Sequence, residues 1–191
     1  MSVGVFGYGS LVLPESIEMT LGRPVGMGRP ARLHAWRRRF SQSRDNLTCE
    51  KTFECDGGRR PEWILGLNVE RGEDAAGPVN GVVIEVADAE LDRLDIREIR
   101  YDRVAVTELV EGEDLPERII TYTAKSDHFA PEPPEDAVIL ATYANAIEKA
   151  FETLGPGELE RYLLTTGPYP VERVQATLVV DHIPDGNPRA W

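Results

Sequence analysis

Short apolar runs separated by turn-forming residues dominate the first two thirds of the chain. Runs rich in β-branched and aromatic residues predict strands at residues 3–6, 63–69, 80–86, 103–110 and 118–123. Residues 31–40 mix apolar and basic side chains, which predicts a further strand with one solvated face. The polar segment 41–62, which includes Asp56-Gly57-Gly58, predicts a loop excursion inside the same domain.

Helical signals become stronger toward the end of the chain. Pro14 and Gly22 bound one short predicted helix, and Asp88 predicts the cap of a second, with Glu90 in its first turn. The longest predicted helix covers about residues 135–154, where one stripe contains Ile139, Tyr143, Ile147, Ala150, Phe151 and Leu154. Because strands come first and helices follow, the pattern predicts an α+β fold. We expect one domain over residues 1–191, with a C-terminal extension after about residue 165.

Composition narrows the class of protein further. The chain has 191 residues, 33 acidic against 21 basic, and a net charge of −12. This charge argues against nucleic acid or an anionic membrane surface as a partner. No apolar run reaches the roughly 18–20 residues of a membrane span, and the first residues lack a secretory signal. We therefore expect a cytoplasmic, reduced protein, in which Cys49 and Cys55 are too few for a disulfide scaffold. The sequence does not specify the oligomeric state.

Common catalytic motifs do not fit the glycine-rich opening. Val12 stands where a dinucleotide fingerprint and a nucleophile elbow would each require glycine, and no Gly-Lys-Ser/Thr step exists. The three histidines and two cysteines are scattered, so no metal site is predicted. The basic run 37–39 is typical of a solvated strand end; the alternative is that Arg38 or Arg39 pairs with a buried carboxylate.

One carboxylate stands out by its position. Helical spacing from Asp88 places Glu98 on the same side as Leu91 and Leu94, at or just beyond the end of the helix. On spacing alone, Glu98 could lean into water or pair with Arg97 or Arg100. If it is enclosed, burial would raise its pKa above the solution value of about 4.3, toward that of a working general base.

The loop from Gly7 to Leu11 has two interpretations. It could be a plain strand-to-helix turn, or a nest in which the N–H groups of Gly9, Ser10 and Leu11 grip a carboxylate or a developing oxyanion. Two glycines favour recognition through the backbone, by close approach of a ligand or by left-handed geometry at Gly9.

Together, two segments resemble a known family. They are Phe6-Gly7-Tyr8-Gly9-Ser10-Leu11 and Leu94-Asp95-x-x-Glu98-x-x-Tyr101-x-Arg103-x-x-Val106. With Asn80-Gly81-Val82-Val83 and the late helix bearing Tyr143 and Ile147, they are similar to the gamma-glutamylcyclotransferase-like superfamily. The likeness covers residues 3 to about 150.

The resemblance implies a small mixed β-barrel with flanking helices and a cofactor-free activity. In that family the α-amine of a γ-glutamyl compound attacks its own γ-carbonyl and releases 5-oxoproline with an amine or amino acid. Carried over by motif, Glu98 is the general base and acid, and Tyr8, Gly9, Ser10 and Leu11 bind the substrate. Tyr143 is a further candidate binding residue, with a core aromatic as the alternative.

Departures from the family leave the leaving group open. Ile99 stands where relatives often have glycine, and residues 41–62 and the tail lie outside the likeness. Glutathione, a γ-glutamyl amino acid, a γ-glutamyl amine on lysine and a γ-glutamyl-protected natural product all remain candidates. The alternatives to a cyclotransferase are a small-molecule binding module of the same fold without turnover, and an enzyme acting on a different amide.

Overall fold

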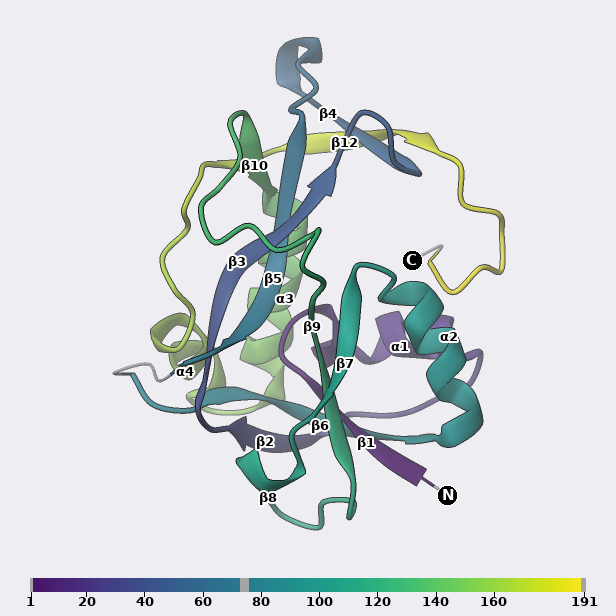
Figure 1. The fold of residues 1–191 in the computed structure, drawn as a ribbon, viewed down its shortest axis with the longest axis vertical. Coiled ribbons are helices and arrows are strands. Elements are labelled where there is room, and N and C mark those ends of the chain that lie inside the picture. Colours follow the sequence, from purple (N-terminus) through teal and green to yellow (C-terminus); the bar gives the residue numbers. More distant parts are fainter. Residues whose placement is uncertain (1, 73–75, 190–191) are drawn as a thin grey trace.

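The computed structural model describes residues 2–72 and 76–189 (Figure 1). Its strands are β1 (Ser2–Gly7), β2 (Arg29–Leu33), β3 (Trp36–Asp45), β4 (Lys51–Cys55), β5 (Trp63–Arg71), β6 (Val79–Ala87), β7 (Tyr101–Ala105), β8 (Val110–Gly112), β9 (Ile119–Ala124), β10 (Ala137–Leu140), β11 (Arg173–Val174) and β12 (Ala176–Asp181). Its α-helices are α1 (Pro14–Leu21), α2 (Leu91–Arg97), α3 (Ala141–Leu154) and α4 (Glu158–Leu164). The predicted α+β class is confirmed.

The strands form three sheets. A six-stranded mixed sheet has the order β7-β9-β1-β6-β2-β8, with β1 antiparallel to β6 and parallel to β9. A four-stranded sheet has the order β11-β10-β5-β3, and β4 pairs with β12 alone. No closed barrel is detected among the described strands, so the β-barrel that the resemblance implies is not found: the strands form three separate sheets. Also within these residues, no helix is long and apolar enough to cross a membrane.

Several predicted elements change in the structure. Residues 31–40 contain two strands, because Ala35 adopts a positive φ of 61° between β2 and β3. The predicted strand at 103–110 is likewise interrupted between β7 and β8. The predicted long helix begins only at Ala141, because residues 137–140 form β10 and pair in parallel with β5.

The polar segment 41–62 is a second correction, because it is not a plain loop. β3 continues to Asp45 and β4 occupies Lys51–Cys55. The interior of β3 is polar but buried: Ser41 donates a 2.5 Å hydrogen bond to Glu70 on β5. A prediction based on hydrophobicity therefore misses this strand, because its buried residues are polar and form hydrogen bonds inside the protein.

The basic run also differs from expectation. Arg38 is fully buried, with its guanidinium 5.0 and 4.3 Å from the ring centroids of Phe151 and Tyr162, two rings that stack on each other at 4.6 Å. It donates to neutral acceptors, including the carbonyls of Tyr8 and Asn80, and burial lowers its pKa to about 9. Arg38 thus has no carboxylate partner among the described residues, whereas Arg39 lies 3.6 Å from the buried carboxylate of Glu70.

Candidate active site

A cavity of about 420 Å³ lies where the sheets meet the N-terminal end of α3 and the C-terminal end of α2. Its walls come from the loop after β1, from β3, β4 and β5, from α3, and from the tail that follows β12. That tail returns toward α1 and α2 (Figure 1), where the Thr20 hydroxyl donates to the carbonyl of Pro188 at 3.5 Å. The residues that line the cavity thus come from segments far apart in the sequence, from Ser10 to Arg189.

Glu98 ends helix α2 at the edge of this cavity. Its N–H donates to Leu94 at 2.7 Å and its carbonyl accepts the Tyr101 N–H at 2.8 Å, which fixes the turn between α2 and β7. Only 13 % of its side chain is exposed. Burial raises the pKa of Glu98, and the neighbouring Arg97 offsets part of that rise.

Arg97 is the partner of Glu98 and lies fully buried beneath it. Its Nε lies 3.0 Å from Oε1 of Glu98. The remaining nitrogens donate to α1 and to the loop after β1: to the Ser16 carbonyl and hydroxyl at 3.1 and 2.6 Å, to the Thr20 hydroxyl at 3.2 Å and to the Ser10 hydroxyl at 3.1 Å. The sequence named Arg97 only as a partner for an exposed glutamate, whereas the structure buries the pair.

The residues of the loop after β1 lie partly at the cavity and partly in the core. Ser10 lines the cavity, whereas Tyr8 and Leu11 are buried in the core, and the Tyr8 hydroxyl donates to the carbonyl of Tyr122 at 2.7 Å. Among the described residues, the N–H groups of Gly9, Ser10 and Leu11 donate to no acceptor. The backbone of this loop therefore retains donors for a ligand.

The sequence singled out Gly9 for close approach, but in the structure it is Gly7 and Gly81 that have no room for a side chain. Gly9 has a φ of −140°, so its backbone is not left-handed, and an added Cβ would meet nothing nearer than 3.6 Å. At Gly7 an added Cβ would lie 2.8 Å from Leu11, and at Gly81 it would lie 2.2 Å from the carbonyl of Gly7. Gly7 and Gly81 are therefore needed for the close approach of β1, β6 and the loop, whereas a Cβ at Gly9 would make ordinary van der Waals contact with Leu67 and with the Tyr143 hydroxyl.

Tyr143 and Tyr101 direct their hydroxyls to the backbone of Leu67, which lies against Gly9 of the loop. The hydroxyl of Tyr143, on α3, accepts the Leu67 N–H at 3.3 Å, and the hydroxyl of Tyr101 donates to the Leu67 carbonyl at 2.8 Å. Burial raises the pKa of both phenols, so both remain protonated near neutral pH. Tyr143 also packs edge-on against Phe40, which means that the ring belongs to the core while its hydroxyl faces the cavity.

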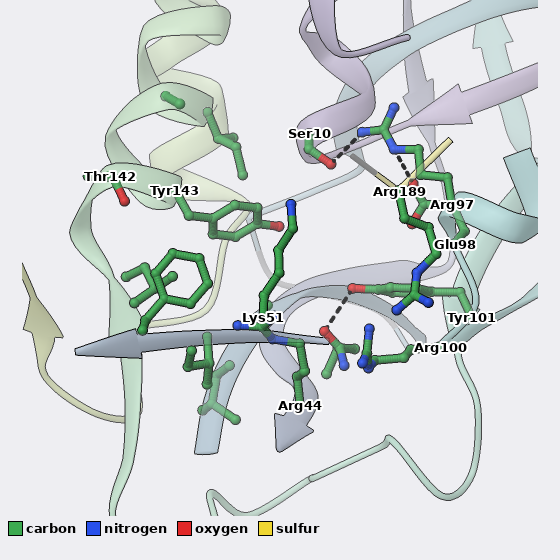
Figure 2. A pocket seen from close by; sticks show the side chains of 18 of the residues that line it. Ser10, Arg44, Lys51, Arg97, Glu98, Arg100, Tyr101, Thr142, Tyr143 and Arg189 are labelled. Carbon is green, nitrogen blue, oxygen red and sulfur yellow. Dashed lines mark hydrogen bonds and ion pairs between the residues drawn. The ribbon is translucent and has the colours of Figure 1, made fainter. Parts of the chain in front are cut away.

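A group of basic side chains on the cavity wall is absent from the sequence prediction. It consists of Arg44, Lys51, Arg100 and Arg189, and we call it the basic wall. Figure 2 shows Lys51 extending between Tyr143 on one side and the Arg97–Glu98 pair on the other, with Arg44 and Arg100 below. The sequence named Arg100 only as a possible partner of Glu98, and in the structure Arg100 pairs with Glu50. No sequence signal marks the other three, which come from β3, β4 and the tail. In the described part of the chain, no three histidine, cysteine or carboxylate side chains group as metal ligands would.

The structure thus brings together Ser10, Glu98 and Tyr143 at one cavity, and leaves Tyr8 and Leu11 behind it. Gly9 lies next to the cavity wall, because a Cβ there would be 3.6 Å from the Tyr143 hydroxyl. Chemically, the arrangement offers a buried carboxylate with an elevated pKa, backbone donors beside it and neutral phenols opposite.

Comparison with solved structures places this fold among the gamma-glutamyl cyclotransferases. A structure described as a gamma-glutamyl cyclotransferase matches with a TM-score of 0.59 and 18 % identity, covering 86 % of each chain. An uncharacterised human protein matches equally well, at 0.59 and 18 %, covering 85 % of this chain and 86 % of its own. A yeast gamma-glutamyl cyclotransferase specific to glutathione matches at 0.52 and 16 %, covering 86 % of this chain and 97 % of its own.

At these identities the likeness establishes the fold alone. No protein-family model matches the sequence, and no curated protein matches it either. The chain has the gamma-glutamyl cyclotransferase fold, and its chemistry must be argued from its own residues.

Proposed function

We propose that this protein is a γ-glutamyl cyclotransferase with Glu98 as its proton acceptor and donor. The observation that carries the proposal is the state of the Glu98 carboxylate. It is largely buried and its pKa is raised, and Arg97 holds one oxygen at 3.0 Å. Among the described residues, the other oxygen has no hydrogen-bond or ion-pair partner. That oxygen is the one available to a substrate.

The reaction uses each of these features. Glu98 takes a proton from the substrate's α-ammonium, and the resulting amine nitrogen attacks the γ-carbonyl carbon. A new C–N bond closes the five-membered ring, the original amide C–N bond breaks, and Glu98 returns the proton to the departing nitrogen. The ring nitrogen loses its second proton as it becomes an amide nitrogen, and the departing amine takes up that proton and leaves as an ammonium. The products are 5-oxoproline and an amine, and the enzyme ends in its starting protonation state.

The enzyme's main contribution is to hold one conformation of the substrate, because nucleophile and electrophile belong to the same molecule. The loop N–H groups at Gly9, Ser10 and Leu11 supply donors for the glutamyl carboxylate or the developing oxyanion. The neutral Tyr143 phenol borders the same space. No cofactor enters these steps.

The test is the formation of 5-oxoproline. The protein is incubated with a panel of γ-glutamyl compounds and the product is detected by mass spectrometry. In Glu98→Gln, which keeps the side-chain shape but cannot accept the proton, we expect turnover to fall at least ~100-fold while substrate binding survives.

The matched control is Glu111→Gln, which removes a carboxylate that is 77 % exposed and lies on the edge strand β8. It should behave as wild type. Unchanged turnover in Glu98→Gln would remove Glu98 from the mechanism, and absence of 5-oxoproline across the whole panel would refute the proposed reaction.

A further inference from the structure

Arg38 is a buried cation that the proposed mechanism does not use. It lies on β3, its side chain is fully buried, and it is not among the residues that line the cavity. Its guanidinium donates six hydrogen bonds, and every acceptor is a neutral oxygen. Burying a charge costs free energy that an apolar side chain of similar size would not cost. Packing alone therefore does not account for a cation at this position.

The guanidinium joins the loop after β1 to two other parts of the fold. Nη1 donates to the carbonyls of Tyr8 and Asn80, at 3.1 and 2.8 Å. Nη2 donates to the side-chain oxygen of Asn80 at 2.8 Å, and Nε donates to the Thr166 hydroxyl at 2.8 Å, just beyond the end of α4. Strand β3 is thus tied to the loop, to β6 and to the segment after α4. These contacts fix the guanidinium directly behind the Tyr8 carbonyl.

The charge of Arg38 is not neutralised by direct contact. Among the described residues Glu158 reaches it through Asn80, whose amide donates to the Glu158 carboxylate at 2.8 Å. Arg32 binds the same carboxylate at 2.5 Å, so two arginines share it. Burial lowers the pKa of Arg38 only to about 9, which leaves the side chain charged near neutral pH. Its field is therefore available to polarise the groups that it contacts.

The Tyr8 carbonyl belongs to the peptide bond whose other end is the Gly9 N–H. In a trans peptide these two groups point in opposite directions, and the described chain contains no cis peptide bond. A carbonyl that is directed at Arg38 therefore directs the Gly9 N–H away from it. That N–H donates to no acceptor among the described residues, and the next residue, Ser10, lines the cavity (Figure 2). Because Gly9 has no side chain, hydrogen bonds rather than steric contacts must fix the orientation of this peptide.

We propose that Arg38 is a positioning residue, which aims and polarises the Gly9 N–H as a donor to an anionic oxygen of the substrate. The inference rests on the proposed function, in which that oxygen belongs to the glutamyl carboxylate or to the developing oxyanion. A cation bound at the carbonyl end of a peptide draws electron density toward itself, so the N–H at the other end becomes a stronger donor. The charge of Arg38 thus acts on the substrate through one peptide bond, and the guanidinium stays outside the cavity.

The first experiment compares Arg38→Lys with Arg38→Met. Lysine keeps a cationic donor but buries its charge with fewer hydrogen bonds, whereas methionine packs well against the stacked rings of Phe151 and Tyr162. We therefore expect Arg38→Met to be the more stable variant in denaturant unfolding and yet the less active one. A merely structural role would instead make activity follow stability.

Activity is measured as kcat/KM per folded enzyme, with the γ-glutamyl compound that yields the most 5-oxoproline. Arg38→Met should lose at least ~10-fold, the scale of a hydrogen bond from a charged group, and Arg38→Lys should retain at least about threefold more activity than Arg38→Met. The control is Phe151→Leu, which removes a core ring beside the guanidinium and leaves the Tyr8 contact in place. It should lower stability and keep the wild-type kcat/KM.

A second measurement uses the wild-type protein, so it applies even if the Arg38 variants do not fold. Tyr8-Gly9 is the only Tyr-Gly step in the sequence, so ¹³C-labelled tyrosine carbonyls and ¹⁵N-labelled glycine select this one peptide in an NMR spectrum. The probe is L-glutamate, whose α-carboxylate and γ-carboxylate stand in for the glutamyl carboxylate and the oxyanion. Because the two ends of a hydrogen-bonded peptide polarise each other, both the Tyr8 carbonyl and the Gly9 amide resonances should shift when L-glutamate binds.

The outcomes separate this inference from the proposed function. If 5-oxoproline forms but Arg38→Met keeps the wild-type kcat/KM, or is more active than Arg38→Lys, Arg38 is structural and the inference fails while the cyclotransferase stands. If no compound yields 5-oxoproline, the proposed function fails and the NMR experiment decides the role of Arg38. A shift at both ends of the peptide, lost in any Arg38→Met protein that folds, upholds the inference, and an unmoved Gly9 resonance overturns it.

Discussion

Two glutamates border the same cavity, each beside arginine, yet their pKa values move in opposite directions. Burial raises the pKa of Glu50, but hydrogen bonds from Arg100 and Arg189 outweigh it and bring the pKa to about 2. Burial also raises the pKa of Glu98, and there the single neighbouring cation does not reverse the effect. The two side chains are similarly enclosed, 19 and 13 % exposed.

The difference lies in how the arginines use their donors. Arg100 presents two nitrogens to Glu50, and Arg189 adds a third contact. Arg97 meets Glu98 through an ion pair at its Nε, 3.0 Å from Oε1, while its other nitrogens donate hydrogen bonds to Ser10, Ser16 and Thr20. A carboxylate that accepts several hydrogen bonds from charged donors stays ionised and structural, whereas one that has only an ion pair of this kind retains an affinity for protons that catalysis can use.

Removing Arg97, the cation that forms an ion pair with Glu98, should have the largest effect on this comparison. In Arg97→Met the pKa of Glu98 rises further, so a larger fraction is protonated near neutral pH and cannot act as a base. We expect the acid limb of the kcat/KM–pH profile to be displaced upward, and kcat/KM on that limb to fall ~10-fold for each unit by which the pKa rises.

The control is Arg93→Met, on the same helix, where the guanidinium donates to the Thr20 carbonyl at 2.8 Å. It should leave the position of the acid limb unchanged. An acid limb in the same place for Arg97→Met and wild type would show that Arg97 does not tune Glu98.

The pKa of Glu50 is shifted in the direction opposite to that of Glu98, and we expect this shift to appear in the pH dependence of stability. Its pKa is lowered by folding, so the stabilisation it provides is complete above the usual carboxyl pKa near 4.5 and is lost as the pH falls toward 2. In Glu50→Gln the free energy of unfolding should therefore change less between pH 5 and pH 2.5, by on the order of 1–2 kcal/mol. Denaturant unfolding followed by circular dichroism at several pH values measures this. A variant with the same pH dependence as wild type would contradict the assigned pairing.

The last variant removes the Ser10 hydroxyl. Its hydroxyl accepts one of several hydrogen bonds from Arg97, so Ser10→Ala should cost at most about 1–2 kcal/mol of transition-state stabilisation. Steady-state kinetics of the folded variant gives the value. An inactive Ser10→Ala, together with an acyl-enzyme trapped in the wild type, would instead make Ser10 a nucleophile.

The sequence predicted the part of the site that depends on local periodicity. Glu98 follows Leu91 and Leu94 at helical spacing, and the structure indeed places it at the end of α2. The turn after β1 was visible because Gly7 and Gly9 flank Tyr8 between a strand and a short helix. In both places neighbours in sequence are also neighbours in space.

The rest depends on contacts between distant segments. β3 was missed beyond residue 40 because its polar residues bond inside the protein, as Ser41 does with Glu70. β10 was assigned to a helix because its apolar residues extend the stripe of α3, and only pairing with β5 separates the two. The basic wall joins Arg44 to Arg189, and no periodicity connects residues so far apart.

The place of β1 at the centre of the six-stranded sheet bears on how the protein folds. Val5 pairs with Ile84 on one side and with Ile120 on the other, so the strand that carries the loop is held entirely by long-range partners. Closing such large loops costs chain entropy before any contact repays it, and folds dominated by non-local pairing typically form in milliseconds to seconds. During synthesis the loop of residues 8–11 must wait for β9, then for α3, before it has a cavity to face. The loop after β1 can therefore become structured only after a long stretch of the chain that follows it has been made.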